Sequence, residues 1–254
     1  MIPPLPKSPK NDDAFEDERH LLGWLVARLS SGCRSDLQFD DLSTEMYLPL
    51  TTVLPLLRAQ IVYGRSVYRL SAHGLSEAAY PLTRAMLEVW AEIEYLLADP
   101  AKAFPRAVEN TVWTLLVIGA PPGKQRSDLD AAVVAAESEF PDAVKAIKRR
   151  FNRYKHHSGR GWSEIIRESC GEDVARLYAM LSWHTHAIAQ NAVDITYEEG
   201  PNYIRETYNQ VRPEGDAISD VCTFAVRALY GSWNAFYSVY GSLGKPRRPE
   251  RTVA

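Results

Sequence analysis

Apolar residues recur along most of this chain at the spacing of one face of an α-helix. The first such stretch begins near Asp12 and stops at Gly32, and its apolar face consists of Leu21, Leu22, Leu25, Val26 and Leu29. The longest stretch covers residues 52–80, with an apolar stripe made of Leu54, Leu57, Ile61, Tyr68 and Leu75. Its basic residues fall on roughly the opposite side: Arg58, Arg65, Arg69 and His73. We therefore expect an amphipathic helix with a basic outer face, which Pro81 ends or kinks.

The remaining patterns predict shorter helices separated by breaks of a few residues. These helices cover residues 82–98, 101–118, 127–139, 142–155, 162–168, 174–193 and 216–240. Proline and glycine mark several breaks, as at residues 99–100 and 121–123. No segment shows a convincing strand alternation, and residues 194–215, with a turn at Gly200-Pro201, are the least regular. The pattern is typical of an all-α protein built as a multi-helix bundle.

The bundle is expected to form a single domain. Prolines are frequent in the first ten residues, which predicts a disordered or extended N-terminus over residues 1–11. The helical domain then covers residues 12–243, with no linker that would divide it. Residues 244–254 are expected to form a flexible basic tail, because lysine and arginine alternate there with proline.

Composition limits the classes of function. The 254 residues carry a net charge of −3, so a nucleic-acid site has to be a local basic patch. Cys33, Cys170 and Cys222 are odd in number and far apart, which favours reduced thiols over disulfides or a zinc knuckle. The most apolar run is about half the length that a bilayer requires, and no signal peptide is evident, so we expect a cytoplasmic protein without membrane contact. No nucleotide-binding glycine motif occurs, and no cofactor is expected.

A basic cluster covers residues 145–160. Its members Lys148, Arg149, Arg153 and Lys155 are candidates for binding the phosphates of a nucleic acid. Phe151 and Tyr154 lie among them and could stack on bases. Alternatively, the cluster is a solvated helix end whose cations complement the helix dipole, or carboxylates of the same chain, such as those of the first helix, neutralise it.

The same cluster contains Arg150 and His156 at the Arg-x4–6-His spacing of HEPN ribonucleases, which are helical bundles. In that chemistry the histidine moves a proton at the ribose hydroxyl or leaving oxygen, and the arginine stabilises the charge on phosphorus. Phe151 departs from the pattern, which usually has a small polar residue after the arginine. We treat Arg150 and His156 as candidate catalytic residues beside the alternative that the spacing arises by chance.

Two further polar patterns lie on helices. Arg84 and Glu88, with Glu92 one turn later, predict a surface ion pair, since periodicity places them away from the apolar face of their helix. Tyr178, Ser182 and His186 also follow one another at four-residue spacing. Periodicity points His186 away from the core, where it could act as a general acid or base.

A metal site is a weaker interpretation of these residues. Glu88 and Glu92 on one helix could combine with His184 and His186 on another to form a carboxylate–imidazole site. Helical di-iron proteins, however, use Glu-x-x-His motifs, and this sequence contains none. The expectation is therefore that no metal is bound.

The middle and later parts of the chain resemble a bacterial family of helical proteins of unknown function. Its members carry Arg-x3-Glu in one helix, a tryptophan further on, and Tyr-x3-Ser-x3-His in a later helix. Here those residues are Arg84, Glu88, Trp162, Tyr178, Ser182 and His186. The resemblance covers about residues 54–193. The family in turn resembles HEPN bundles, but more loosely. It implies, against the periodicity, that the polar residues meet in space as a buried network or an active site.

The sequence thus leads to a bundle that binds or acts on nucleic acid. RNA, or another phosphate-bearing ligand, is the expected partner of a metal-independent, RNase-like toxin or defence effector. His186, His156 and Arg150 would carry the chemistry, supported by a polar network of Arg84, Glu88, Tyr178 and Ser182. Two alternatives remain: a non-enzymatic module that oligomerises or regulates through its helix faces, and a helical enzyme that depends on a metal or small molecule.

Overall fold

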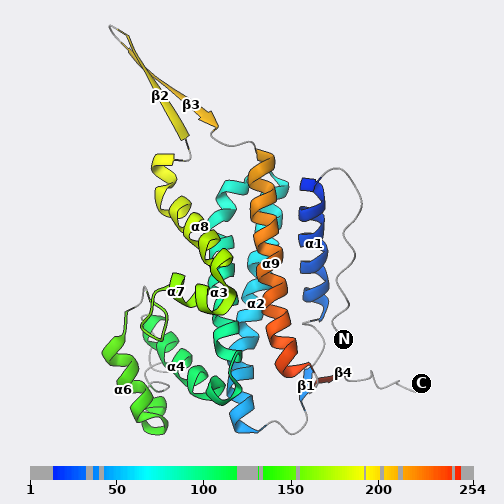
Figure 1. The fold of residues 1–254 in the computed structure, drawn as a ribbon, viewed down its shortest axis with the longest axis vertical. Helices are drawn as coiled ribbons and strands as arrows, with labels where there is room; N and C mark the ends of the chain where they lie inside the picture. The colour runs from blue at the N-terminus through cyan, green and yellow to red at the C-terminus, as the bar shows by residue number, and fades with distance from the viewer. Residues whose placement is uncertain are drawn as a thin grey trace, which may run out of the picture.

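The computed structural model describes residues 14–32, 37–39, 43–118, 131, 134–152, 155–191, 193–200, 203–210, 214–241 and 244–246. The labelled helices are α1 (Ala14–Gly32), α2 (Thr44–Ala72), the short 3-10 helix η1 (Ser76–Ala79), α3 (Tyr80–Leu97), α4 (Pro100–Ile118), α6 (Pro141–Arg150), α7 (Trp162–Cys170), α8 (Glu172–Asn191) and α9 (Glu214–Tyr240). The predicted all-α, multi-helix fold is confirmed (Figure 1). None of the described helices is both long and apolar enough to cross a bilayer.

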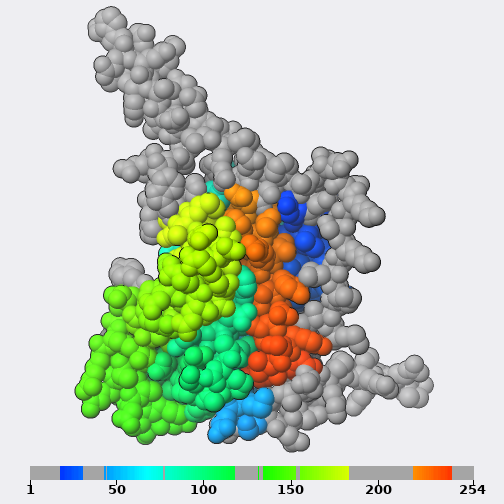
Figure 2. All heavy atoms as spheres, viewed as in Figure 1, coloured from blue at the N-terminus to red at the C-terminus, as the bar shows by residue number. Residues whose placement is uncertain are grey.

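Helix α3 occupies the centre of the bundle. It contacts α2 and α9 on one side and α4, α7 and α8 on the other, whereas α1 lies against α2 and α9 (Figure 1). In the space-filling view, α4, α6, α7 and α8 form a continuous face beside α9 (Figure 2). Because helices cover it on two sides, α3 buries residues around most of its circumference: Tyr80, Thr83, Met86, Leu87, Ala91, Glu92, Ile93, Leu96 and Leu97.

The second and third helices differ from their predicted bounds. Helix α2 begins earlier than residue 52, includes Pro49 and Pro55, and ends at Ala72. The chain then reverses at Gly74, whose φ of 69° is the left-handed conformation that glycine favours. Leu75 follows that turn and is exposed, although the pattern placed it on the core stripe. Pro81 begins α3 instead of ending α2, because a proline in the first turn removes no intrahelical hydrogen bond.

The basic segment also departs from the prediction. Helix α6 ends at Arg150, whereas the pattern extended it to residue 155. Phe151 leaves the helix with φ −58° and ψ 121°, so His156 and His157 lie in a loop. We refer to residues 155–161 as the histidine loop.

The structure also contains two antiparallel pairs of strands, although the sequence predicted no strand. Strands β2 (Val193–Gly200) and β3 (Tyr203–Gln210) form an antiparallel pair at the end of α8, in which Gly200 is opposite Tyr203 (Figure 1). Strand β1 (Leu37–Phe39) pairs with β4 (Gly244–Pro246), which is the beginning of the predicted tail. The predicted N-terminal segment 1–11 and residues 247–254 lie outside the described part of the chain.

A close contact between α3 and α9 offers a test of this packing. A Cβ atom at Gly231 of α9 would lie 2.1 Å from Trp90 of α3, whose indole donates a hydrogen bond to Glu94. We expect Gly231→Ala to lower the free energy of unfolding by about 1–3 kcal/mol, although alanine favours helices. Denaturant unfolding would measure it. Gly161→Ala is the control, since no atom lies within 4 Å of its Cβ. A Gly231→Ala protein as stable as the wild type would contradict this packing.

Candidate functional site

A stripe of charged residues runs down one face of α3. Arg84, Glu88 and Glu92 are four residues apart, so their side chains lie above one another on the helix. The prediction that this stripe is a surface ion pair is wrong for Glu92, which is only 4% exposed. Periodicity within α3 does not reveal that α7, α8 and the histidine loop pack against the stripe. The three residues belong to two groups, which we call the tyrosine group and the histidine group.

The tyrosine group joins α3 to α8. The Tyr178 hydroxyl donates a hydrogen bond to Glu88 Oε1 at 2.8 Å and accepts one from Arg84 at 3.1 Å. Arg84 Nε lies 3.3 Å from Glu88 Oε1, and the guanidinium lies over the Tyr178 ring at 5.2 Å. These residues therefore meet, as the family resemblance implied and the periodicity did not.

The tyrosine group is partly open to solvent. The side chains of Arg84 and Glu88 are 21% and 24% exposed. Burial, followed by the charge of Glu88, raises the pKa of the Tyr178 hydroxyl, which stays protonated at neutral pH. The group thus offers a cation, a carboxylate and a phenol donor near the surface.

The rest of the predicted motif lies further along α8. Ser182 is half-buried one turn after Tyr178. His186 is on the same helix two turns after Tyr178, and its side chain, like that of His184, lies outside the described residues. Trp162 begins α7, with its ring 5.1 Å from that of His156, so it belongs with the histidine group.

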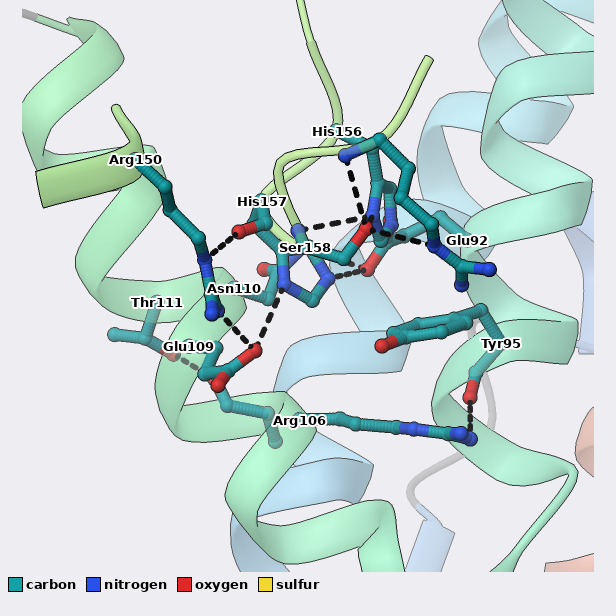
Figure 3. A network of polar contacts seen from close by, with 12 residues as sticks. Glu92, Tyr95, Arg106, Glu109, Asn110, Thr111, Arg150, His156, His157 and Ser158 are labelled. Atoms are coloured by element: carbon teal, nitrogen blue, oxygen red, sulfur yellow. Dashed lines mark hydrogen bonds and ion pairs between the residues drawn. The ribbon is translucent and has the colours of Figure 1, made fainter. Parts of the chain in front are cut away.

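The histidine group surrounds the carboxylate of Glu92 (Figure 3). His156 Nε2 lies 2.6 Å from Glu92 Oε2, and His157 Nε2 lies 3.0 Å from Glu92 Oε1. Both histidines are at most 2% exposed. Among the described residues, these three form a group whose possible metal-ligand atoms lie within 4.8 Å of one another.

Further polar residues hold this group from outside. Asn110 of α4 donates a hydrogen bond to Glu92 Oε1 at 2.9 Å. Glu109 lies 3.6 Å from His157 Nδ1 and 2.7 Å from Arg150. Ser158 Oγ and the Ser158 backbone nitrogen lie 2.8 and 3.1 Å from His156 Nδ1. Figure 3 shows the His157 ring between the carboxylates of Glu92 and Glu109.

Burial and neighbouring charges shift the pKa values of Glu92 and His156 downward and that of His157 upward. Burial alone would raise the pKa of Glu92, but the charge of His157 and hydrogen bonds from both histidines hold it well below its usual range. Burial lowers the pKa of His156 by more than Glu92 raises it. For His157, Glu92 and Glu109 outweigh burial and raise the pKa. Glu92 is therefore ionised, and His157 holds its proton more strongly than His156.

This placement bears on two residues predicted to be catalytic. His156 is 1% exposed and directed at Glu92, so a substrate has no access to it in this conformation. Arg150 donates a hydrogen bond to the His157 carbonyl oxygen and pairs with Glu109. The spacing of Arg150 and His156 arises because Arg150 ends α6 and His156 lies in the loop that follows this helix. The sequence did not identify Glu92 as the partner of His156. The available signal was a carboxylate on a polar stripe together with two adjacent histidines.

Carboxylates of the same chain neutralise part of the basic cluster, as one alternative proposed. Lys148 pairs with Glu137, and Arg160 pairs with Glu168. The proposed source, the first helix, is wrong for these pairs, since the carboxylates come from segments beside the cluster. Lys145, Arg149 and Lys155 are exposed. Arg153 lies outside the described residues.

The carboxylates of the predicted carboxylate–imidazole set belong to different groups. Glu88 contacts Tyr178, whereas Glu92 contacts the two histidines of the loop. The side chains of His184 and His186 lie outside the described residues, among which Glu92, His156 and His157 form a group that could hold a metal ion.

The tyrosine group predicts an energetic coupling between α3 and α8. In a double-mutant cycle of Tyr178→Phe and Glu88→Ala, we expect a coupling of about 0.5–3 kcal/mol, because the residues share a partly buried hydrogen bond. The exposed pair Arg167 and Glu172 is the control and should couple more weakly. Denaturant unfolding of the single and double variants would measure both. Additive effects at Tyr178 and Glu88 would contradict the contact.

The histidine group predicts that Glu92 is required for stability. Glu92→Ala should lower the free energy of unfolding by about 3–5 kcal/mol, because it leaves the charge of His157 buried without its nearest partner. Glu164→Ala is the control: its side chain is 57% exposed and lies 3.7 Å from Arg160, so the loss should stay below about 1 kcal/mol. Equal stability of the two variants would contradict the assigned contacts.

Comparison with known proteins gives the chain a family. No curated protein and no solved structure matches it. One protein family, described as a family of unknown function (DUF5677), matches residues 51–196, which is more than half of the chain. The matched segment contains every residue of the tyrosine and histidine groups. The chain therefore belongs to this family of unknown function.

Proposed function

We propose that this protein binds RNA and cleaves it at the tyrosine group by side-chain acid–base chemistry. The observation that carries the proposal is the convergence of Arg84 and Glu88 with Tyr178, about ninety positions later in the chain, at a partly exposed place between two helices. A purely structural ion pair would not need a third polar group. A phosphodiester-cleaving site needs a cation, an oriented donor and a proton carrier.

Each residue has a chemical role in this proposal. Arg84 stabilises the charge that develops on the phosphate oxygens, and Glu88 and Tyr178 fix the direction of its guanidinium. His186 takes the proton of the ribose 2′-hydroxyl while that oxygen bonds to phosphorus. The bond to the 5′-oxygen breaks, and the leaving oxygen takes a proton from a water molecule of the solvent, to which the group is partly open. The products are a 2′,3′-cyclic phosphate and a free 5′-hydroxyl.

The exposed basic residues of α6 and the histidine loop are the proposed backbone contacts. Lys145, Arg149 and Lys155 are exposed, and Lys148 borders the same surface. Contacts with phosphates would make RNA binding weaken as salt rises. His156 and Arg150 have no part in catalysis here, because both are engaged in the histidine group.

Cleavage of single-stranded RNA by the purified full-length chain, in buffer without added divalent ions, tests the proposal. His186→Ala should reduce the rate by about 10²–10⁴-fold, the usual contribution of a general acid or base. Arg84→Ala should also reduce it, and Tyr178→Phe should do so less severely. His73→Ala is the matched control, since His73 is exposed at the end of α2, and it should retain full activity.

RNA binding by the wild-type chain distinguishes a nuclease from an RNA-binding protein and from an assembly module. A wild-type chain that binds RNA without cleaving it would leave only the binding part of the proposal. Neither binding nor cleavage, or full activity in His186→Ala, would overturn the catalytic proposal and favour an assembly module. Loss of expression toxicity in His186→Ala, with unchanged protein levels, would support it in cells.

A further inference from the structure

We propose that Glu92, His156 and His157 bind one divalent transition-metal ion, which fastens the histidine loop to α3. The site is distinct from the tyrosine group, and the proposal does not depend on RNA cleavage. Two imidazoles and a carboxylate are the donor set that Zn²⁺, Fe²⁺ and Mn²⁺ accept in proteins. Zn²⁺ is the probe of choice, because it has no redox chemistry.

The first support is the direction of the donor atoms. Nε2 of each histidine points at a different oxygen of Glu92, at 2.6 and 3.0 Å. The three residues thus offer one ligand atom each to a single ion, from the middle of α3 and from adjacent positions of one loop. Three protein ligands leave the fourth position of a tetrahedral zinc ion to a water molecule.

The second support is an oxygen acceptor behind each imidazole ring. His156 Nδ1 lies 2.8 Å from Ser158 Oγ and accepts a hydrogen bond from the Ser158 backbone N–H at 3.1 Å, so Oγ is the oxygen available to it once its proton is on Nδ1. His157 Nδ1 is buried, makes no hydrogen bond among the described residues, and faces a Glu109 carboxylate oxygen at 3.6 Å. Histidines that bind metals usually donate their second N–H to such an oxygen, which fixes the ring and makes the ligand nitrogen more basic. Arg150 in turn holds Glu109 at 2.7 Å.

The third support is the position of the group in the fold. Glu92 comes from α3, whereas the two histidines belong to a loop between α6 and α7. The loop has its own backbone bonds, from Gly159 to the His156 carbonyl and from His156 to the Arg160 carbonyl. These bonds shape the loop, and the contacts of the two histidines with Glu92 attach it to α3. An ion held by both segments would strengthen that attachment.

Binding of the ion exchanges protons for metal. Without the ion, the Nε2–H groups of both rings donate to Glu92. With the ion, both rings are neutral and coordinate through Nε2. His157 releases its Nε2 proton and keeps the one on Nδ1, which faces Glu109. The single proton of His156 moves from Nε2 to Nδ1 and is donated to Ser158 Oγ, in place of the hydrogen bond that Nδ1 accepts from the Ser158 backbone N–H.

Metal content of the full-length chain, purified with a tag that contains no histidine, tests the proposal. We expect about one equivalent of metal, or binding of about one Zn²⁺ by chelator-treated protein in a calorimetric titration. Zn²⁺ at a hundredfold excess over its Kd should raise the melting temperature by about 5–10 °C. Glu92→Gln and His157→Gln should abolish both effects. His73→Gln, with an exposed histidine on another helix, should abolish neither.

Two outcomes would overturn the proposal. The first is chelator-treated wild-type protein that neither binds nor is stabilised by Zn²⁺, Fe²⁺ or Mn²⁺, which would leave the group as a hydrogen-bonded ion pair. The second is unchanged stoichiometry in Glu92→Gln. If the variants do not fold, by far-UV circular dichroism, the absorption of the Co²⁺-loaded wild type decides. Bands of nitrogen and oxygen ligation support the site, and thiolate charge-transfer bands would place the ion at a cysteine instead.

Discussion

The fold depends on how the buried carboxylate of Glu92 is compensated. An isolated ionised carboxylate in a protein interior costs many kilocalories per mole, so its partners have to be present whenever the chain is folded. Those partners are two adjacent histidines of a loop and an amide of α4. One side chain in the middle of α3 therefore brings together the neighbouring helix α4 and a loop that is distant in the sequence. A hydrophobic residue at position 92 could fill the space, but it could not dictate which loop covers it.

This attachment has consequences further along the chain. The histidine loop leads directly into α7, and the edge of the Trp162 ring meets His156. Helix α7 ends at Gly171, whose φ of 96° allows an immediate start of α8. Helix α8 then brings Tyr178 against Arg84 and Glu88. The position of the tyrosine group therefore depends on the histidine group through a short and covalently continuous path.

The sequence predicted the helices well where one pattern determines them. Residues 82–98 were expected to be helical, and α3 covers Tyr80–Leu97, with the apolar Met86 and Ile93 buried. Periodicity failed where the burial of a side chain depended on packing against a second helix. It assigned the Arg84 stripe to solvent, because it records only the relative directions of side chains on one helix. It also extended α6 through the basic run, since local charge does not reveal that Glu92, some sixty positions earlier, holds the loop.

Depth divides the polar stripe of α3 into parts with different physical properties. At Glu92 the stripe is sealed, so every charge has a fixed partner and rearrangement is costly. At Glu88 and Arg84, one and two turns away, the same stripe reaches solvent and its charges can be shared with a ligand. A site that binds a phosphate needs charges that reach solvent, as at Arg84 and Glu88. Precise placement of its arginine also needs a rigid, sealed group nearby, as at Glu92. Because both lie on one rigid helix face, stabilising the sealed part also positions the open part.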